Sequence, residues 1–267
     1  MKKITPDKLL KMKKEGEKIT ALTSYDYSTA KIVDEAGIDM ILIGDSLAMV
    51  VLGHKTTHSV TMEEMLIFTK AVARAVNHAL VVADMPFGSY ETSLEKATEN
   101  ACKFISAGAN AVKIEGGAEY TINLVNHLVS QGIPVIAHLG FTPQFLNTIG
   151  GYKVQGKEQK QTELILNQAK ALQKAGASAL VLEMTNESSA KYIAKNLDIP
   201  VIGIGAGRYC DGEILVIDDI LGKFNDFTPK FVKKYANLHN IMTDAVSTYA
   251  KEVKEGIFPS KEHAFEL

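Results

Sequence analysis

Five short apolar segments of this 267-residue sequence each end in a side chain that can bind a metal or transfer a proton. These terminal side chains are Asp45, Asp84, Glu115, His138 and Glu183. Apolar runs of this length, separated by helical patterns, are typical of buried parallel strands. In a parallel α/β barrel, the active site lies at the carboxyl ends of the strands. The pattern therefore predicts an enzyme with its site at that end of a barrel.

Three of these acids follow three successive predicted strands, so their carboxylates should lie close together. Such carboxylates repel one another unless a cation intervenes, and oxygen ligands without cysteine suit a hard ion such as Mg2+. Taken singly, each acid has an ordinary alternative. Asp45 and Ser46 could form a turn or an N-cap, and Asp84 could be a turn residue before Pro86. Taken together with Glu115, they favour a metal site with open positions for water or substrate.

Lys113 lies two residues before Glu115, so both side chains share one face of a strand. A lysine inside a barrel is costly unless it meets an anion, and we therefore expect acids or a carboxylate ligand beside it. Glu183 would lie across the barrel mouth, which suits a general base better than a ligand of the same metal. His138 could be a ligand, a proton relay, a hydrogen-bonding partner of the substrate or a structural residue.

Eight predicted strands alternate with helices, after a short helix that begins near Thr5. This strict alternation predicts a closed (β/α)8 TIM barrel, and the chain has a normal length for that fold. No linker or low-complexity tract interrupts it, so we expect a single domain over residues 1–267. The expected strands are 18–23, 39–45, 80–84, 111–115, 134–138, 179–183, 200–204 and 214–218.

The longest segment without a helix or strand pattern runs from Leu139 to about Gln159, directly after His138. Long loops of this kind are commonly functional, and its glycines would permit backbone movement. We expect it to cover the barrel mouth, with static packing between subunits as the alternative. The glycine-rich residues 205–207, after the seventh strand, could bind phosphate or simply permit close packing.

Composition excludes several classes of function. A net charge of −2 argues against nucleic acid or an anionic membrane as the main partner. The sequence has no apolar segment long enough to cross a bilayer and no signal-peptide core near its start. Cys102 and Cys210 lie in unrelated segments. They are expected to be reduced thiols of a cytoplasmic protein.

Eight motifs along the chain together indicate a family. They are Thr23-Ser24-Tyr25-Asp26, Gly44-Asp45-Ser46-Leu47, Ala83-Asp84-Met85-Pro86-Phe87, Val112-Lys113-Ile114-Glu115-Gly116-Gly117, His138-Leu139-Gly140, Gly150-Gly151-Tyr152-Lys153-Val154-Gln155-Gly156, Gly203-Ile204-Gly205-Ala206-Gly207 and Pro229-Lys230-Phe231. With these motifs the sequence resembles, over nearly its whole length, the ketopantoate hydroxymethyltransferase family. Ala48 and Phe145-Leu146 depart from the family pattern, and neither position carries a proposed ligand.

The resemblance implies transfer of a one-carbon unit from 5,10-methylenetetrahydrofolate to 3-methyl-2-oxobutanoate. The product would be 2-dehydropantoate, on the route to pantothenate. It also implies a cytoplasmic homo-oligomer, a homodecamer in this family, with one Mg2+ per subunit. Residues alone would indicate only metal-dependent enolisation of a small oxo acid, without the folate.

The resemblance further implies roles for individual residues. Glu183 would be the proton acceptor. Mg2+ would be held by Asp45, Asp84 and Glu115. Ser46 and Lys113 would bind the oxo acid. The metal ligands Asp45 and Asp84 would also contact it, and His138 would lie beside it.

Two other functions fit parts of the pattern. A Mg2+-dependent carbon–carbon lyase of the isocitrate-lyase kind would use a similar barrel, but it commonly needs a reactive cysteine in a mobile loop. Neither Cys102 nor Cys210 lies in the segment after His138. A catalytically silent barrel that only binds an oxo acid would predict a damaged set of acids, whereas all five groups at the strand ends are present.

Overall fold

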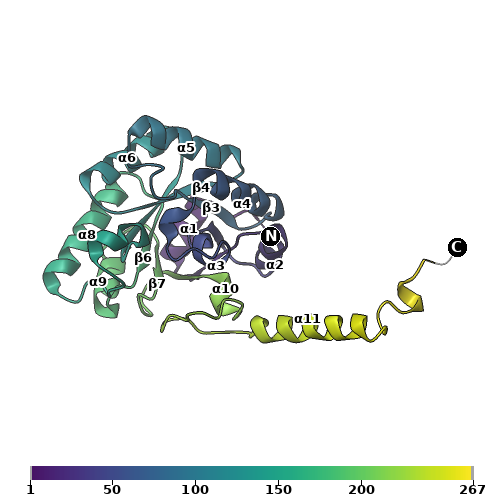
Figure 1. The fold of residues 1–267 in the computed structure, drawn as a ribbon. Coiled ribbons are helices and arrows are strands. Elements are labelled where there is room, and N and C mark those ends of the chain that lie inside the picture. The colour runs from purple at the N-terminus through teal and green to yellow at the C-terminus, as the bar shows by residue number, and fades with distance from the viewer. Residues whose placement is uncertain (1, 266–267) are drawn as a thin grey trace. The chain divides into compact units, whose positions relative to one another are not determined.

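Eight parallel strands close into a barrel in the computed structural model, which describes residues 2–265 (Figure 1). Consecutive strands are neighbours, and the last strand pairs with the first. The predicted (β/α)8 barrel is thereby confirmed. The strands are β1 (Ile19–Thr23), β2 (Met40–Ile43), β3 (Leu80–Asp84), β4 (Ala111–Glu115), β5 (Val135–Gly140), β6 (Ala179–Glu183), β7 (Val201–Ile204) and β8 (Gly212–Leu215).

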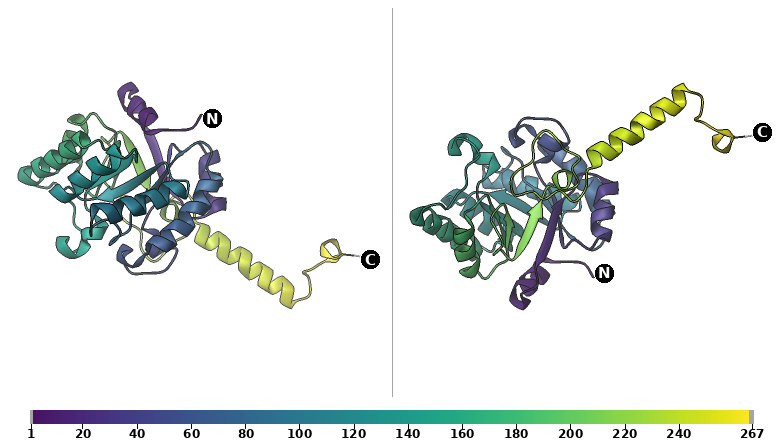
Figure 2. Two further views of the ribbon diagram at one scale, coloured as in Figure 1. Left: turned by 90° about the horizontal axis from the view of Figure 1, so that it is seen from above. Right: turned by 90° about the horizontal axis from the view of Figure 1, so that it is seen from below.

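Helices lie outside the strands, as all three views show (Figures 1 and 2). The expected short helix before the first strand is present as α1 (Pro6–Glu15). The helices that follow are α2 (Tyr27–Glu35), α3 (Leu47–Val50), α4 (Met62–Ala75), α5 (Leu94–Ser106), α6 (Glu119–Ser130), α7 (Leu146–Ile149), α8 (Gln159–Lys174) and α9 (Glu187–Lys195), with two short 3-10 turns, η1 (Thr57–Ser59) and η2 (Pro143–Phe145).

Helix α4 begins at a capping box that the sequence predicts from Thr61 and Glu64. The Thr61 hydroxyl accepts a hydrogen bond from the Glu64 backbone N–H at 3.2 Å, and the Glu64 carboxylate accepts one from the Thr61 backbone N–H at 2.8 Å. Two backbone donors of the first turn are thereby satisfied. This fixes the start of the helix that leads to β3.

An apolar layer fills the barrel lumen below the strand ends. Side chains that alternate along the strands contribute to it, among them Met40, Leu80, Ala111 and Ile136. Because side chains two apart share a face, the next lumen positions on β4 after Ala111 are Lys113 and Glu115. The fold therefore brings polar groups together directly above an apolar floor.

The predicted position of the last strand was wrong. Strand β8 begins at Gly212 rather than at residue 214, and residues 217–220 form a short helix instead of its end. The strand begins where it does because β8 passes close to β1 there. A Cβ atom at Gly212 would overlap the carbonyl oxygen of Ile19, and the pairing ends with Leu22 beside Leu215.

The segment after β5 also differs from the prediction, because it is not irregular throughout. Strand β5 continues to Gly140, and η2 and α7 follow it. Pro143 at the first position of η2 has a backbone angle suited to a helical turn. The segment therefore has local structure at its start, and its extended part lies between α7 and α8.

Residues from Ile217 form a second compact unit. It contains α10 (Ile217–Ile220), α11 (Leu238–Lys254) and η3 (Lys261–His263). No residue of α11 is buried, and its apolar side chains Ile241, Val246 and Tyr249 are exposed. The single domain over residues 1–267 stays a prediction.

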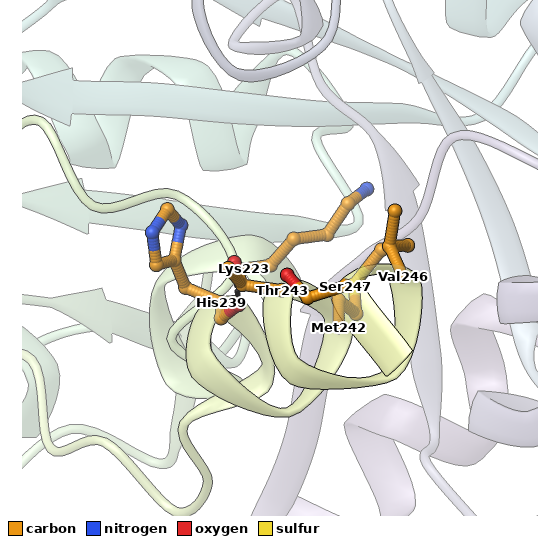
Figure 3. A pocket seen from close by; sticks show the side chains of 6 residues that line it. All are labelled: Lys223, His239, Met242, Thr243, Val246 and Ser247. Atoms are coloured by element: carbon orange, nitrogen blue, oxygen red, sulfur yellow. Dashed lines mark hydrogen bonds between the residues drawn. The ribbon is translucent and has the colours of Figure 1, made fainter. Parts of the chain in front are cut away.

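A hollow beside α11 lies within this second unit (Figure 3). The side chains that line the hollow are Lys223, His239, Met242, Thr243, Val246 and Ser247.

Among the described helices, none combines the length and the apolar character that a membrane span requires.

Candidate active site

The strand register explains why the predicted site residues meet. Asp84 on β3 is paired with Lys113 on β4, and Glu115 is paired with His138 on β5. Glu183 on β6 is paired with Gly140. A Cβ atom at position 140 would overlap the Glu183 carbonyl oxygen. Glycine therefore lets the end of β5 lie close to Glu183.

Asp45, Asp84 and Glu115, here called the acid cluster, are all buried. The Lys113 ammonium is buried among them, with Nζ 2.8 Å from Asp84 Oδ1 and 3.3 Å from Glu115 Oε1. The backbone N–H of Asp45 donates to Asp84 Oδ2 at 3.1 Å. The expected meeting of Lys113 with acids in the lumen is observed, and three carboxylates share the neighbourhood of one lysine.

The electrostatics of the acid cluster follow from this imbalance. Burial, together with the charges of Asp84 and Glu115, raises the pKa of Asp45 well above its ordinary value. Burial also raises the pKa of Asp84, although Lys113 opposes this shift. Burial would lower the pKa of Lys113, but the neighbouring carboxylates outweigh it and raise that pKa. The carboxyl groups of the cluster outnumber Lys113, so ionising all three together is unfavourable without a further cation.

Glu115 is the member of the cluster that is best compensated. Burial alone would raise its pKa, but Lys113, His138 and hydrogen bonds lower it to about 2. The Gln144 backbone N–H is one of those donors, at 3.1 Å from Glu115 Oε2. A carboxylate that accepts several hydrogen bonds keeps its charge even when buried.

His138 connects the acid cluster to Glu183. Its Nδ1 lies 3.1 Å from Glu115 Oε1 and 3.1 Å from Lys113 Nζ, while its Nε2 lies 3.3 Å from Glu183 Oε2. Burial and Lys113 lower the pKa of His138, but the two carboxylates outweigh them and raise it to about 9. The Glu183 side chain is 15% exposed, unlike those of the acid cluster. Glu183 therefore lies at the edge of the site that solvent reaches.

Ser46 lies next to Asp45, at the start of the short helix α3. Its Oγ is 2.8 Å from the hydroxyl of Tyr25, a buried residue for which the sequence predicts no role. The hydroxyls of Tyr25 and Ser46 thus form a polar pair beside the acid cluster.

Sequence reasoning missed Gln144, which lies in η2 directly over the acid cluster. Its side-chain amide donates to Asp45 Oδ2 and to the Met85 carbonyl, each at 3.0 Å, and accepts from the Tyr90 hydroxyl at 2.6 Å. A usable signal was present. Pro143 predicts a turn soon after the fifth strand, and a polar residue in that turn lies at the barrel mouth.

The rest of the segment after β5 is held at its far end. Gln155 forms a parallel bridge with Thr185, and the Gly156 carbonyl accepts a hydrogen bond from Ser189 at 2.6 Å. Between these points Tyr152 is 60% exposed, and its ring lies 5.0 Å from that of buried Phe141. The segment therefore has two fixed ends and an exposed middle.

The donor set fits a hard divalent cation. Three buried carboxyl groups gather around Lys113, and the ammonium of this lysine is the partner of Asp84 Oδ1 at 2.8 Å. In this structure the Lys113 ammonium bridges Asp84 and Glu115. Within residues 2–265, no three His, Cys, Asp or Glu side chains are spaced as a formed metal site. The fit rests on the chemistry and charge of the donors.

Comparisons with known proteins assign the chain to a family. A family model described as ketopantoate hydroxymethyltransferase matches residues 3–261. The 3-methyl-2-oxobutanoate hydroxymethyltransferase of Thermoanaerobacter sp. strain X514 is 56% identical over 266 residues, covering 99% of this chain and 97% of the relative. The Enterococcus faecalis protein of the same name is 54% identical over 256 residues, covering 96% of this chain and 93% of the relative.

Solved structures of low identity share the fold. Phosphonopyruvate hydrolase has a TM-score of 0.62 at 14% identity, with 97% of this chain and 93% of that chain covered. The 2,3-dimethylmalate lyase, a member of the PEP mutase/isocitrate lyase superfamily, has a TM-score of 0.61 at 17% identity, with 97% and 91% covered. The barrel architecture is therefore one that solved enzymes of other activities also have.

Proposed function

Because this chain belongs to the ketopantoate hydroxymethyltransferase family, we propose that it uses 5,10-methylenetetrahydrofolate to hydroxymethylate 3-methyl-2-oxobutanoate. The chain is a hydroxymethyltransferase, and its product in this proposal is 2-dehydropantoate, on the route to pantothenate. The observation that carries the proposal is the position of Glu183, beside His138 and at the exposed edge of a buried acid cluster.

Asp45, Asp84 and Glu115 are the proposed ligands of one Mg2+ per subunit. Their burial side by side supports this assignment. Burial, together with the charges of Asp84 and Glu115, raises the pKa of Asp45, and a divalent cation would favour its ionised form. When bound, such a cation withdraws charge from the keto oxygen of an oxo acid and so acidifies the neighbouring carbon.

Lys113 and Ser46 are the proposed contacts of the oxo acid. The Lys113 ammonium is held in the lumen by Asp84 and Glu115 and can offset negative charge on the substrate. Ser46 is oriented by the Tyr25 hydroxyl and presents an O–H or a lone pair beside Asp45. His138, buried between Glu115 and Glu183, would lie beside the substrate.

Glu183 is the proposed base that removes the C3 proton. Its carboxylate reaches the edge of the site, where a bound oxo acid would present that carbon, and His138 Nε2 lies 3.3 Å from it. A base must lie within hydrogen-bond reach of the proton that it removes. The resulting enolate would form the new carbon–carbon bond to the methylene carbon that the folate supplies. Both carbon–nitrogen bonds of that carbon break, one water provides the hydroxyl of the product, and the two folate nitrogens are left protonated in tetrahydrofolate.

The exposed middle of the segment after β5 is the proposed cover of this reaction. An enolate open to water would be reprotonated before it meets the methylene donor. Residues 145–154 lie between two fixed ends, which suits a segment that closes over a bound substrate. Phosphate binding by the glycine-rich residues 205–207 stays a prediction.

We also propose a homo-oligomer, a homodecamer as in the resembled family, in the cytoplasm. Helix α11 supports association between subunits, because exposed apolar residues such as Ile241, Val246 and Tyr249 gather on it. Both cysteines, Cys102 and Cys210, are free thiols, which fits a reducing compartment.

A turnover assay tests the function. Purified protein, Mg2+, 3-methyl-2-oxobutanoate and 5,10-methylenetetrahydrofolate should yield 2-dehydropantoate, and omission of either the folate or Mg2+ should abolish product. Product formed equally well when free formaldehyde replaces the folate would point to a lyase running in reverse. Binding of the oxo acid without any product would point to a silent binding barrel.

A further inference from the structure

Gln144 is a buried residue whose polar atoms all have hydrogen-bond partners, two of which belong to the acid cluster. Its side chain is almost fully buried, at 3% exposure for the residue. The amide nitrogen donates to Asp45 Oδ2 and to the Met85 carbonyl, and the amide oxygen accepts from Tyr90. Its backbone N–H donates to Glu115 Oε2 at 3.1 Å. One residue therefore contacts two of the three acids.

The orientation of the Gln144 amide is fixed from outside the cluster. Tyr90 is buried, and its hydroxyl donates to Gln144 Oε1 at 2.6 Å. The Met85 carbonyl can only accept, so it requires the amide NH2 on its own side. Together these partners leave one N–H of Gln144 directed at Asp45 Oδ2.

Asp45 is the member of the acid cluster that this hydrogen bond affects. Asp45 is buried and is raised in pKa by Asp84 and Glu115, and the Gln144 side chain is a neutral donor to its carboxylate. A neutral donor restricts the rotation of a carboxylate without neutralising it. The charge thus stays available to a cation, while the orientation of its oxygens is set in advance.

We propose that Gln144 is a positioning residue that orients the Asp45 carboxylate for Mg2+, with Tyr90 holding the Gln144 amide in place. This inference rests on the proposed function of the acid cluster. It also gives the segment after β5 a second role, because the turn η2 carries the residue that orients a ligand on β2.

The test must separate positioning from simple structural support. Gln144→Met keeps the length of the side chain but removes its amide, so it releases Asp45 and also leaves the buried Tyr90 hydroxyl without its acceptor. Tyr90→Phe removes that hydroxyl. In the double variant Tyr90→Phe/Gln144→Met, both partners are apolar, and such paired replacement is often nearly neutral for stability.

Two measurements are made on the full-length protein. Urea unfolding reports stability, and calorimetry reports the affinity for Mg2+ titrated into protein with 3-methyl-2-oxobutanoate. We expect Gln144→Met to lose both stability and affinity. The double variant should regain the part of the stability that the unpaired Tyr90 hydroxyl costs, although the Met85 carbonyl stays without its Gln144 donor. Its Mg2+ affinity should stay about 10-fold or more below that of the wild type, as for other outer partners of metal ligands.

Gln173→Met is the matched control. Gln173 is also a glutamine with several hydrogen bonds, donating to Asp198 Oδ2 and accepting from the backbone N–H groups of Asp198 and Ile199. It lies near the end of α8, which leads into the amino end of β6, opposite the site. This variant should lose stability and keep wild-type Mg2+ affinity.

The outcomes separate this inference from the proposed function. If the wild type binds Mg2+ and the double variant binds it equally tightly, Gln144 is not a positioning residue, although the function stands. If the Gln173→Met protein also loses affinity, the loss follows instability and the inference fails. If the wild-type protein itself binds no Mg2+, the proposed function fails and the inference fails with it.

Discussion

Lys113 Nζ lies 2.8 Å from Asp84 Oδ1 inside the barrel lumen, where both side chains are buried. The strand register fixes this pair, because Asp84 and Lys113 are direct neighbours on β3 and β4. A lysine this deep is held by charge, and it is the cation of the acid cluster in this structure. The relationship makes Lys113 important for stability as well as for substrate binding.

Replacement of Lys113 by methionine should therefore destabilise the fold. Removing one partner of a buried ion pair costs roughly 3–5 kcal/mol, and here it leaves three carboxylates together. Mg2+ should restore part of the loss by neutralising them. Urea unfolding with and without Mg2+ measures both effects. A free energy of unfolding equal to that of the wild type would mean that the acids are compensated by other groups.

Removal of one proposed metal ligand should weaken binding while the barrel stays folded. Asp84→Ala should lower the affinity for Mg2+ and oxo acid by well over about 10-fold, because outer partners of metal ligands alone are worth that much. Calorimetry gives the affinities, and circular dichroism checks the fold. Unchanged affinities in this variant would assign the acid cluster another purpose.

Asp34 predicts how stability depends on pH away from the site. Its buried carboxylate accepts hydrogen bonds from the backbone N–H groups of Asn77 and Ala79 at 2.8 Å and 2.7 Å, and from that of His78. Burial raises the pKa of Asp34, but these donors outweigh it and lower the pKa below 3.8. The folded state therefore favours the ionised form, which contributes stability above pH 3.8 and loses it as pH falls through the lowered pKa.

Asp34→Asn should accordingly cost about 1–3 kcal/mol at neutral pH. The difference from the wild type should shrink as the pH falls below 3.8. Urea unfolding curves of both proteins at several pH values measure this dependence. A difference that stays constant into acid would show that the carboxyl charge contributes nothing to these hydrogen bonds.

Hydrogen exchange can distinguish a closing segment from a static one. The amides of Phe141, Gln144 and Phe145 should exchange slowly even without ligand, because each donates a hydrogen bond in the structure. Amides of residues 146–154 should become protected only when oxo acid and Mg2+ are added, with no change in oligomer size. Protection of that middle part in the free protein would identify it as fixed structure or as a subunit contact.

The sequence was sufficient to predict most of the barrel and the residues at its strand ends. Because side chains alternate along a strand, the sequence predicts that Lys113 and Glu115 share one face of β4. It likewise predicts that the acid at the end of each apolar run lies at the carboxyl end of a strand. Local patterns could not place Gln144, because its role depends on hydrogen bonds to Asp45 and Tyr90, which lie 99 and 54 residues away in sequence.

The boundary of β8 was missed for a related reason. The apolar run at residues 214–217 predicts a strand, but the observed strand begins at Gly212, where only a residue without a Cβ fits against β1. Such a close approach is a property of two strands in contact. The pairing of Tyr25 with Ser46 likewise joins two different βα loops, and neither loop has a pattern that indicates it.

The central claim is that Glu183 removes the C3 proton of the oxo acid, and isotope exchange tests it directly. With Mg2+ and 3-methyl-2-oxobutanoate in D2O, and without folate, the wild-type protein should exchange the C3 proton. Glu183→Gln keeps the shape of the side chain but loses its basicity, so exchange should slow by about 100-fold or more, while Mg2+ affinity changes little. Exchange at the wild-type rate in this variant would contradict the account.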